Sequence, residues 1–436
     1  MVGTSSTAGG RPAGGWRSSA AATLAAAVLA GVLGLAPSAW AAPPPGACGH
    51  ADPAQPPVAE LPWAQRVLDP ASVWPHSTGA GVLVAVVDSG VDSDHPQLRA
   101  RGAVLRGADF HLVGDLPGNF DCVSHGTAVA SIVTADPVAG IGFAGLAPDA
   151  RILPVRVSER DLTDTGRVET IDPALLANAI RYAAGQGAKV INLSLAGVSD
   201  NRQVRDAVAY ARSRDALLVA AAGNQQQGTA GRKSFPAAYE GVLGVGAVDQ
   251  FGIRLPSSQV GSHVDLVAPG GGVLAATRAG GHQYWQGTSF AAPFVSATAA
   301  LVRSAWPKLT ADQVAERIVA TATPAPGGPG YGAGLVNPYR AVTDGLVSAP
   351  PDPSPSVTLP PVDPARVRAA AWWDDTGQHA RLAMLLACGA TGLAMVAALV
   401  AGRGRRARWQ ARRAAPTPTG PAPVEPPEQL FLLPPP

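Results

Sequence analysis

The chain contains, at residues 81–90, the stretch Gly81-Val-Leu-Val-Ala-Val-Val-Asp-Ser-Gly90. Its continuous run of apolar, mostly β-branched residues predicts a strand that is buried on both faces. Asp88 follows the run directly, and active sites of parallel sheets gather at the carboxyl ends of their strands. Because many strands of this kind end in an aspartate, Asp88 alone does not predict catalysis.

Similar apolar runs recur along the chain, and stretches with helical spacing separate them. The expected strands are residues 151–157, 189–193, 216–222 and 242–246, and the expected helices are residues 173–187 and 201–215. Strands that alternate with helices predict a parallel sheet with helices on both faces. We therefore expect an α/β domain of three layers.

Two short motifs each open a further apolar helix. Residues 124–130, Ser-His-Gly-Thr-Ala-Val-Ala, place His125 in a first helical turn, where the helix dipole disfavours protonation. A general base must be neutral before it accepts a proton, although a lone histidine is more often structural. Residues 287–293, Gly-Thr-Ser-Phe-Ala-Ala-Pro, place Ser289 at a helix start. There it is either an N-cap or a nucleophile whose own N–H faces an oxyanion.

Aspartate, histidine and serine, in this order on an α/β body, resemble the arrangement in subtilisin. Residues 86–91, 125–130 and 287–293 resemble the three signature segments of the subtilisin-like serine peptidases, and the resemblance covers roughly residues 76–343. It implies a three-layer subtilisin-like fold with a mainly parallel sheet. It also implies that His125 takes the proton of Ser289 while Asp88 orients His125. Protein or peptide substrates are expected, with no cofactor and no metal.

The same resemblance assigns roles to two more segments. Residues 221–224, Ala-Ala-Gly-Asn, resemble the strand end whose asparagine donates to the oxyanion, so Asn224 is expected in that role. A second segment resembles the strand that pairs with the substrate backbone and lines the first specificity pocket; it consists of Ser194, Leu195, Ala196 and Gly197. Ala196 stands where the family usually has glycine, which bears on the shape of that pocket.

The N-terminus of the chain predicts export. Residues 1–41 combine two arginines, an apolar run over residues 20–35 and the small-x-small triplet Ala39-Trp40-Ala41, so we expect a signal peptide that is cleaved before Ala42. An uncleaved anchor is the alternative, but the apolar run is short for a membrane span.

The C-terminal region predicts a membrane anchor. Residues 382–401 contain no charged residue, and they are long enough to cross a bilayer core of about 30 Å. Arginines are frequent directly after this run, so we expect residues 402–436 to form a basic, Pro-rich cytoplasmic tail and the catalytic body to face outward. A buried core helix, the alternative, does not explain these unequal flanks. Residues 346–381 are expected to form a Pro-rich stalk.

The cysteines and the net charge limit the possible partners. Cys388 lies in the expected span, which leaves Cys48 and Cys122 as the pair expected to form a disulfide in an exported body. Two free thiols are the alternative. A net charge of +2 does not indicate a nucleic-acid partner.

The order of segments along the chain resembles that of one group within the subtilisin-like peptidases. Residues 42–75 are Pro-rich and too few for a separately folded prodomain, so we expect an extension that lies across the peptidase body at residues 76–345. With the signal peptide, the stalk and one span, this order resembles the mycosins, membrane-anchored proteases of type VII secretion systems. It implies exported proteins as substrates and the secretion complex in the cell membrane as a partner. A mainly structural role in that complex and a degradative protease unrelated to secretion are the alternatives.

Overall fold

The computed structural model describes residues 46–345, apart from residues 100, 113–114, 160–170, 227–230 and 326–327, and also the isolated residues 392 and 401. The chain divides into two compact units, Met1–Leu346 and Val347–Pro436, and the account below concerns the first. The predicted signal peptide, stalk, span and tail lie outside the described residues, apart from those two isolated positions. Among the described residues, no helix is both long and apolar enough to cross a bilayer.

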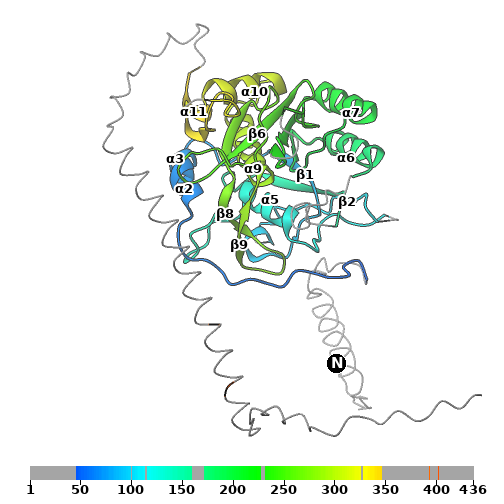
Figure 1. The fold of residues 1–436 in the computed structure, drawn as a ribbon, viewed down its shortest axis with the longest axis vertical. Helices are drawn as coiled ribbons and strands as arrows, with labels where there is room; N and C mark the ends of the chain where they lie inside the picture. The colour runs from blue at the N-terminus through cyan, green and yellow to red at the C-terminus, as the bar shows by residue number, and fades with distance from the viewer. Residues whose placement is uncertain are drawn as a thin grey trace, which may run out of the picture. The chain divides into compact units, whose positions relative to one another are not determined.

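A seven-stranded parallel sheet forms the middle of the domain (Figure 1). Its strands, in spatial order, are β2 (Ala108–Asp109), β3 (Arg151–Arg156), β1 (Leu83–Asp88), β4 (Val190–Leu193), β5 (Leu217–Ala221), β6 (Val242–Val248) and β7 (Leu266–Pro269). In the register of β1, Val84 pairs with Ile152 on one side and with Val190 on the other. The strands β8 (Gly271–Ala276) and β9 (His282–Gln286) form a separate antiparallel hairpin.

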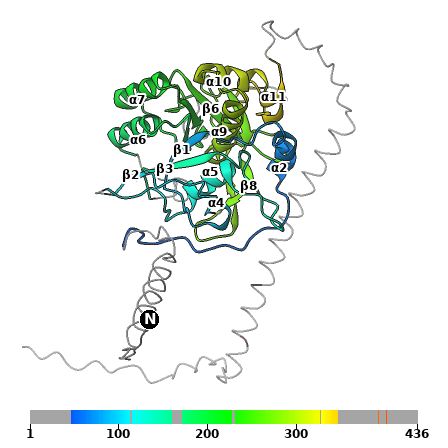
Figure 2. The same ribbon diagram turned by 180° about the vertical axis from the view of Figure 1, so that it is seen from behind.

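Helices cover both faces of the sheet, as the two opposite views show (Figures 1 and 2). The helices α5 (His125–Thr134) and α9 (Thr288–Ala305) pack on one face, and α6 (Pro173–Gly185) and α7 (Arg202–Ser213) pack on the other. The remaining described helices are α2 (Trp63–Leu68), α3 (Pro70–Val73), α4 (Pro96–Arg99), α10 (Ala311–Ala320) and α11 (Pro338–Thr343).

The side chains of β1 show why its sequence is continuously apolar. Val84 and Val86 belong to the apolar cluster that contains α5 and α9, whereas Ala85 and Val87 belong to the cluster that contains α6 and α7. Successive side chains of a strand point to opposite faces of the sheet, so a strand covered on both faces needs apolar residues at every position. The predicted parallel sheet with helices on both faces is confirmed.

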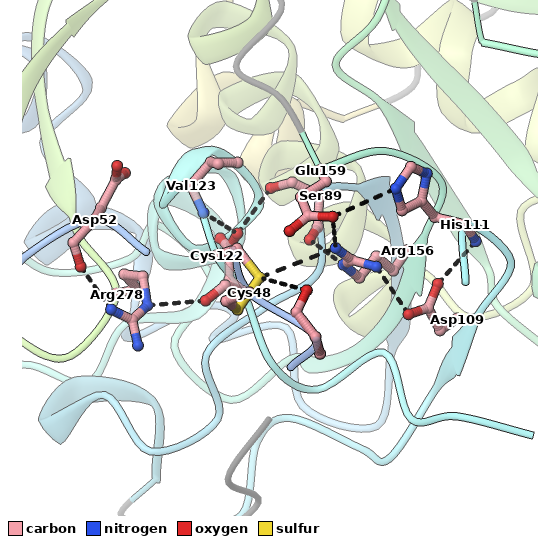
Figure 3. Close-up of a disulfide and its surroundings, with 12 residues drawn as sticks. Cys48, Asp52, Ser89, Asp109, His111, Cys122, Val123, Arg156, Glu159 and Arg278 are labelled. Carbon is pink, nitrogen blue, oxygen red and sulfur yellow. Dashed lines mark hydrogen bonds and ion pairs between the residues drawn. A yellow bond between two sulfur atoms is a disulfide. The ribbon is translucent and has the colours of Figure 1, made fainter. Parts of the chain in front are cut away.

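The N-terminal segment, residues 46–62, lies against the body without forming a helix or a strand. The disulfide Cys48–Cys122 joins it to the loop before α5, which confirms the predicted pair (Figure 3). Further along, the N–H of Gln55 donates to the carbonyl of Gly280 at 3.0 Å, and Pro56 accepts from the N–H of His282 at 3.1 Å. The segment is therefore fixed both by a covalent bond and by backbone contacts with the β8–β9 hairpin.

Removal of the disulfide should destabilise the domain. The bond closes a loop with a sequence separation of 74 residues. Loss of such a bond typically costs about 2–5 kcal/mol of unfolding free energy, because the unfolded chain gains freedom. We expect a loss of this size for the double variant Cys48→Ala/Cys122→Ala, measured by urea unfolding. The wild type under reducing conditions serves as the control and should unfold at the same urea concentration as the variant. Equal stability of the oxidised wild type and the variant would contradict this expectation.

Candidate active site

Asp88 and His125 form a buried hydrogen-bonded pair at the carboxyl edge of the sheet. Asp88 is the last residue of β1 and His125 is the first residue of α5. The Nδ1 atom of His125 lies 2.7 Å from Oδ1 of Asp88, and the two side chains are 4% and 5% exposed. The N–H of Ser89 donates to the same carboxylate oxygen at 2.7 Å. Because an ionised carboxylate only accepts, Nδ1 must carry a proton, which leaves Nε2 as the basic atom of the neutral ring.

Ser289 enters the site from the start of α9. It is the second residue of that helix and is 6% exposed. The ring of Phe290, the next residue, packs against the imidazole of His125 with 5.0 Å between the ring centroids. The structure thus brings the start of α9, which carries the predicted nucleophile, against the start of α5, which carries the predicted base.

The backbone carbonyl of Ser289 has an unusual partner. In a regular helix it would accept a hydrogen bond from the residue four positions later, but that residue is Pro293, which has no N–H. The hydroxyl of Ser194 donates to this carbonyl instead, at 2.6 Å. Ser194 in turn accepts from Asn192 at 2.9 Å, and Asn192 accepts from the Ser296 hydroxyl at 2.8 Å. This buried network fixes the first turn of α9 to the end of β4.

Asn224 lies three residues beyond the end of β5 and faces the same helix start. Its Oδ1 accepts from both the N–H and the hydroxyl of Thr288, at 2.8 and 3.0 Å. This arrangement leaves the amide Nδ2 as a donor beside Gly287. Gly287 has a φ of 137°, and a Cβ at this position would lie 2.9 Å from Nδ2 of Asn224. Glycine is therefore required at residue 287, because it permits both the backbone angle and the close approach of the amide. The predicted oxyanion donor thus lies at the N-terminus of α9, where the N–H of Ser289 is also located.

The predicted substrate-binding segment runs outward from β4. Ser194 and Leu195 are buried, Ala196 is half-buried and Gly197 is exposed. The N–H and carbonyl of Gly197 both pair with Phe235, at 2.7 Å each. Gly197 therefore anchors the segment, and backbone pairing with a substrate would fall to the residues before it; this role stays a prediction.

A pocket adjoins the site beyond Asn224. It has a volume of about 260 Å³ and is lined by Asn224, Gln225, Pro256, Ser257 and Gln286. No residue of this lining is charged, and amide groups dominate it. As for metals, the described part of the chain contains no group of three or more His, Cys, Asp or Glu side chains that is placed to bind one.

Asp121, a buried carboxylate four residues before His125, belongs to none of the motifs that the sequence offers. It is 2% exposed, and burial raises the pKa of this carboxyl to about 6. The carboxylate accepts hydrogen bonds from Ser89, Val123 and Thr127. Its position just ahead of the histidine motif was the only signal in the sequence, and it resembles that of an ordinary loop residue.

Comparisons with known proteins agree on one family. The model of the subtilase family matches residues 79–342. A thermophilic serine proteinase of Bacillus sp. (strain AK1) is 38% identical over 276 residues, which cover 62% of this chain and 64% of that protein. Thermitase of Thermoactinomyces vulgaris is 37% identical over 279 residues, which cover 64% of this chain and 94% of that protein.

A solved structure with a similar fold is that of the MycP3 protease from the type VII (ESX-3) secretion system. It is 33% identical with a TM-score of 0.57, and the match covers 70% of this chain and 97% of that one. The structure of MycP1 from Mycobacterium smegmatis gives 30% identity and a TM-score of 0.58, over 74% of this chain and 98% of that one.

Replacement of Asn224 should test its predicted role as an oxyanion donor. We expect Asn224→Ala to lower kcat by about 10²–10³, the loss measured in a subtilisin that lacks the corresponding donor, with little change in KM. Steady-state kinetics on a chromogenic peptide would measure both constants. Gln203→Ala, which removes an exposed amide on α7, is the matched control and should keep a kcat close to that of the wild type. An Asn224 variant with unchanged kcat would remove this residue from the catalytic machinery.

Proposed function

The chain belongs to the subtilase family of serine proteases, and from this membership we propose that it is a serine endopeptidase that cleaves exported proteins. The observation that carries the proposal is the buried Asp88–His125 pair, against which Phe290, the neighbour of Ser289 in α9, packs. Asp88, His125 and Ser289 come from three different elements, so their meeting is a property of the fold and not of one local motif.

The geometry supports a stepwise acyl transfer. Nε2 of His125 takes the proton of the Ser289 hydroxyl as its oxygen attacks the carbonyl carbon of the peptide bond. Asp88 stabilises the imidazolium that forms, and Nδ2 of Asn224 together with the N–H of Ser289 donates to the oxyanion. His125 then gives its proton to the leaving amine, and a water molecule, activated by the same histidine, releases the acyl group from Ser289.

We further propose that the peptidase acts at the outer face of the cell membrane in association with a type VII secretion complex. The similar MycP3 structure is described as a protease from such a system, and a similar MycP1 structure as an essential component of one. The predicted signal peptide, stalk and single span support the same location, because they would hold the catalytic body outside the membrane. A mainly structural role in the complex, with proteolysis secondary, is the second candidate, and the disulfide-fixed N-terminal segment favours it as a rigid surface feature.

Removal of the nucleophile tests the peptidase function. We expect Ser289→Ala to lower kcat by about 10⁶, as in a subtilisin that loses its nucleophile, because no neighbouring group can form the acyl intermediate. Ser213→Ala, at the exposed end of α7, is the matched control. Retained turnover in the Ser289 variant would refute the serine-peptidase proposal.

The same variant in cells separates the two candidate functions. Secretion that survives Ser289→Ala but fails when the gene is deleted would support the structural role. Secretion that fails in both strains would support proteolytic processing. Secretion that is normal in both would favour a protease unrelated to secretion.

The proposed topology predicts opposite outcomes for two reporter fusions. A reporter fused after Asp344 should be exported, and one fused after Arg413 should stay in the cytoplasm, because the arginines between residues 402 and 414 retain that end inside. Alkaline phosphatase and green fluorescent protein fusions would report the two sides. Digestion of intact spheroplasts provides an independent measurement, and protection of the catalytic body from added protease would overturn the assignment.

A further inference from the structure

The carboxylate of Asp121 occupies a closed polar site beneath the catalytic pair. Its Oδ1 accepts from the Ser89 hydroxyl at 3.0 Å and from the N–H of Val123 at 3.1 Å. Its Oδ2 accepts from the N–H and the hydroxyl of Thr127, at 2.9 and 2.7 Å. Four donors thus converge on two oxygens, in a site that is 2% exposed.

These contacts give the catalytic pair a second connection. Ser89 follows Asp88, and its hydroxyl oxygen accepts from the N–H of Gly126, the residue after His125, at 2.9 Å. Asp121 binds this hydroxyl on one side and the first turn of α5 on the other. One carboxylate therefore contacts both the residue that follows Asp88 and the helical turn that begins with His125.

We propose that Asp121 is a positioning residue of the catalytic site: its ionised carboxylate holds the turn after Asp88 against the first turn of α5, and its protonated form does not. The proposal rests on the proposed peptidase function, because it concerns the geometry of that site. It assigns to Asp121 no contact with substrate.

The donors around Asp121 explain why the ionised form is needed. Each carboxylate oxygen faces one backbone N–H, which can only donate, so a proton on either oxygen would point at another proton. The hydroxyls offer no better acceptor. Ser89 already accepts from Gly126, and Thr127 accepts from the N–H of Asp92 at 2.9 Å. Protonation must therefore displace at least one of the four contacts, or reverse one of the two hydroxyl bonds by turning that hydroxyl's own proton away from the carboxylate.

Several charged groups surround Asp121. The charge of Asp88, at the end of β1, opposes ionisation of Asp121. His125 is the first residue of α5, the helix that Oδ2 of Asp121 contacts. Arg156 at the end of β3 donates to the carbonyl of Ser89 at 3.1 Å. Arg278, in the turn after β8, donates from Nε to the backbone carbonyl of Asp121 at 2.9 Å (Figure 3 labels Arg156 and Arg278). Both of these hydrogen bonds go to backbone carbonyls, whereas the donors to the carboxylate are N–H and O–H dipoles.

Burial raises the pKa of Asp121 from 3.8 to about 6, and the hydrogen bonds from Thr127 and Val123 oppose this shift. A raised pKa means that the folded protein binds the proton more tightly than the unfolded chain does. The contribution of this group to stability is therefore complete below pH 3.8 and is lost as the pH rises through about 6. Acidification from pH 7 to pH 5 should stabilise the fold through Asp121 while removing the form that positions His125.

The pH dependence of kcat/KM tests the proposal. In the wild type, two protonations, at Asp121 and at His125, should lower kcat/KM on the acid side, so its logarithm should fall with a slope that approaches 2. Asp121→Asn should leave a slope of 1. The plateau of kcat/KM should lie about 10–100-fold lower through kcat, because the NH₂ group of the asparagine faces a backbone N–H and thereby displaces the Asp88–His125 pair. KM should change little, because the substrate-binding segment at residues 194–197 lies elsewhere.

Asp265→Asn is the matched control. Asp265 accepts from the N–H of Gly244 at 2.7 Å, and burial raises its pKa too. It lies directly before β7, at the amino edge of the sheet, opposite the edge that carries the site. This variant should keep the slope of 2 and the wild-type plateau.

The outcomes are distinct. An Asp121→Asn protein with the wild-type slope and plateau would overturn the proposal, and so would one with lower stability but an unchanged slope and kcat, because the role would then be structural only. Should this variant not fold, Ser89→Ala decides, since it removes one donor and keeps the carboxylate; an unchanged kcat there would also overturn the proposal.

A measurement without turnover keeps the proposal separate from the proposed function. In the Ser289→Ala protein, the ¹³C signal of the Asp121 carboxyl should titrate near pH 6, and the Nδ1 proton of His125 should change in the same range. Loss of the second change in Asp265→Asn, or its absence in the parent, would overturn the coupling even if no substrate is ever cleaved.

Discussion

The hydrogen bond between Asp88 and His125 requires the end of a strand and the start of a helix to approach more closely than side chains normally allow. Gly126 makes this possible, because a Cβ at that position would lie 2.0 Å from the carbonyl oxygen of Gly90. The strand β1 is in turn held between β3 and β4 and covered on both faces, so its last residue has a single position. The layered architecture therefore fixes this contact.

The nucleophile is positioned by a different device. Pro293 removes a hydrogen bond from the first turn of α9, and Ser194 replaces it from the neighbouring strand. A helix that satisfied its own first turn would need no such link to the sheet. The hydrogen bond that is missing within the helix is therefore replaced by one between helix and sheet. It ties the orientation of Ser289 to β4, and the residues that follow this strand are predicted to bind substrate. Catalytic and binding geometry are thus connected through one hydroxyl group.

Local patterns determined how much could be predicted from the sequence. The strand at residues 81–88 and the starts of α5 and α9 follow from contiguous motifs, and the disulfide followed from the number and location of the cysteines. The hairpin at residues 271–286 was not predicted, because glycines interrupt its pattern, and the short helices α2 and α3 lie in a Pro-rich segment. Asp121 was missed for another reason. Its partner Ser89 is 32 residues away, and only the fold shows that a loop carboxylate is buried among donors. The membrane span and the signal peptide stay predictions.

The bond between Cys48 and Cys122 also determines the result of a cut in the backbone between these two residues. These cysteines enclose β1, with Asp88, and the whole stretch up to the loop before His125. A single cut anywhere between them produces two pieces that remain covalently joined, and the parallel pairing of β1 with β3 and β4 holds the cut piece in the sheet. A peptidase is exposed to cleavage by its own copies. In this region such damage would leave the molecule in one piece.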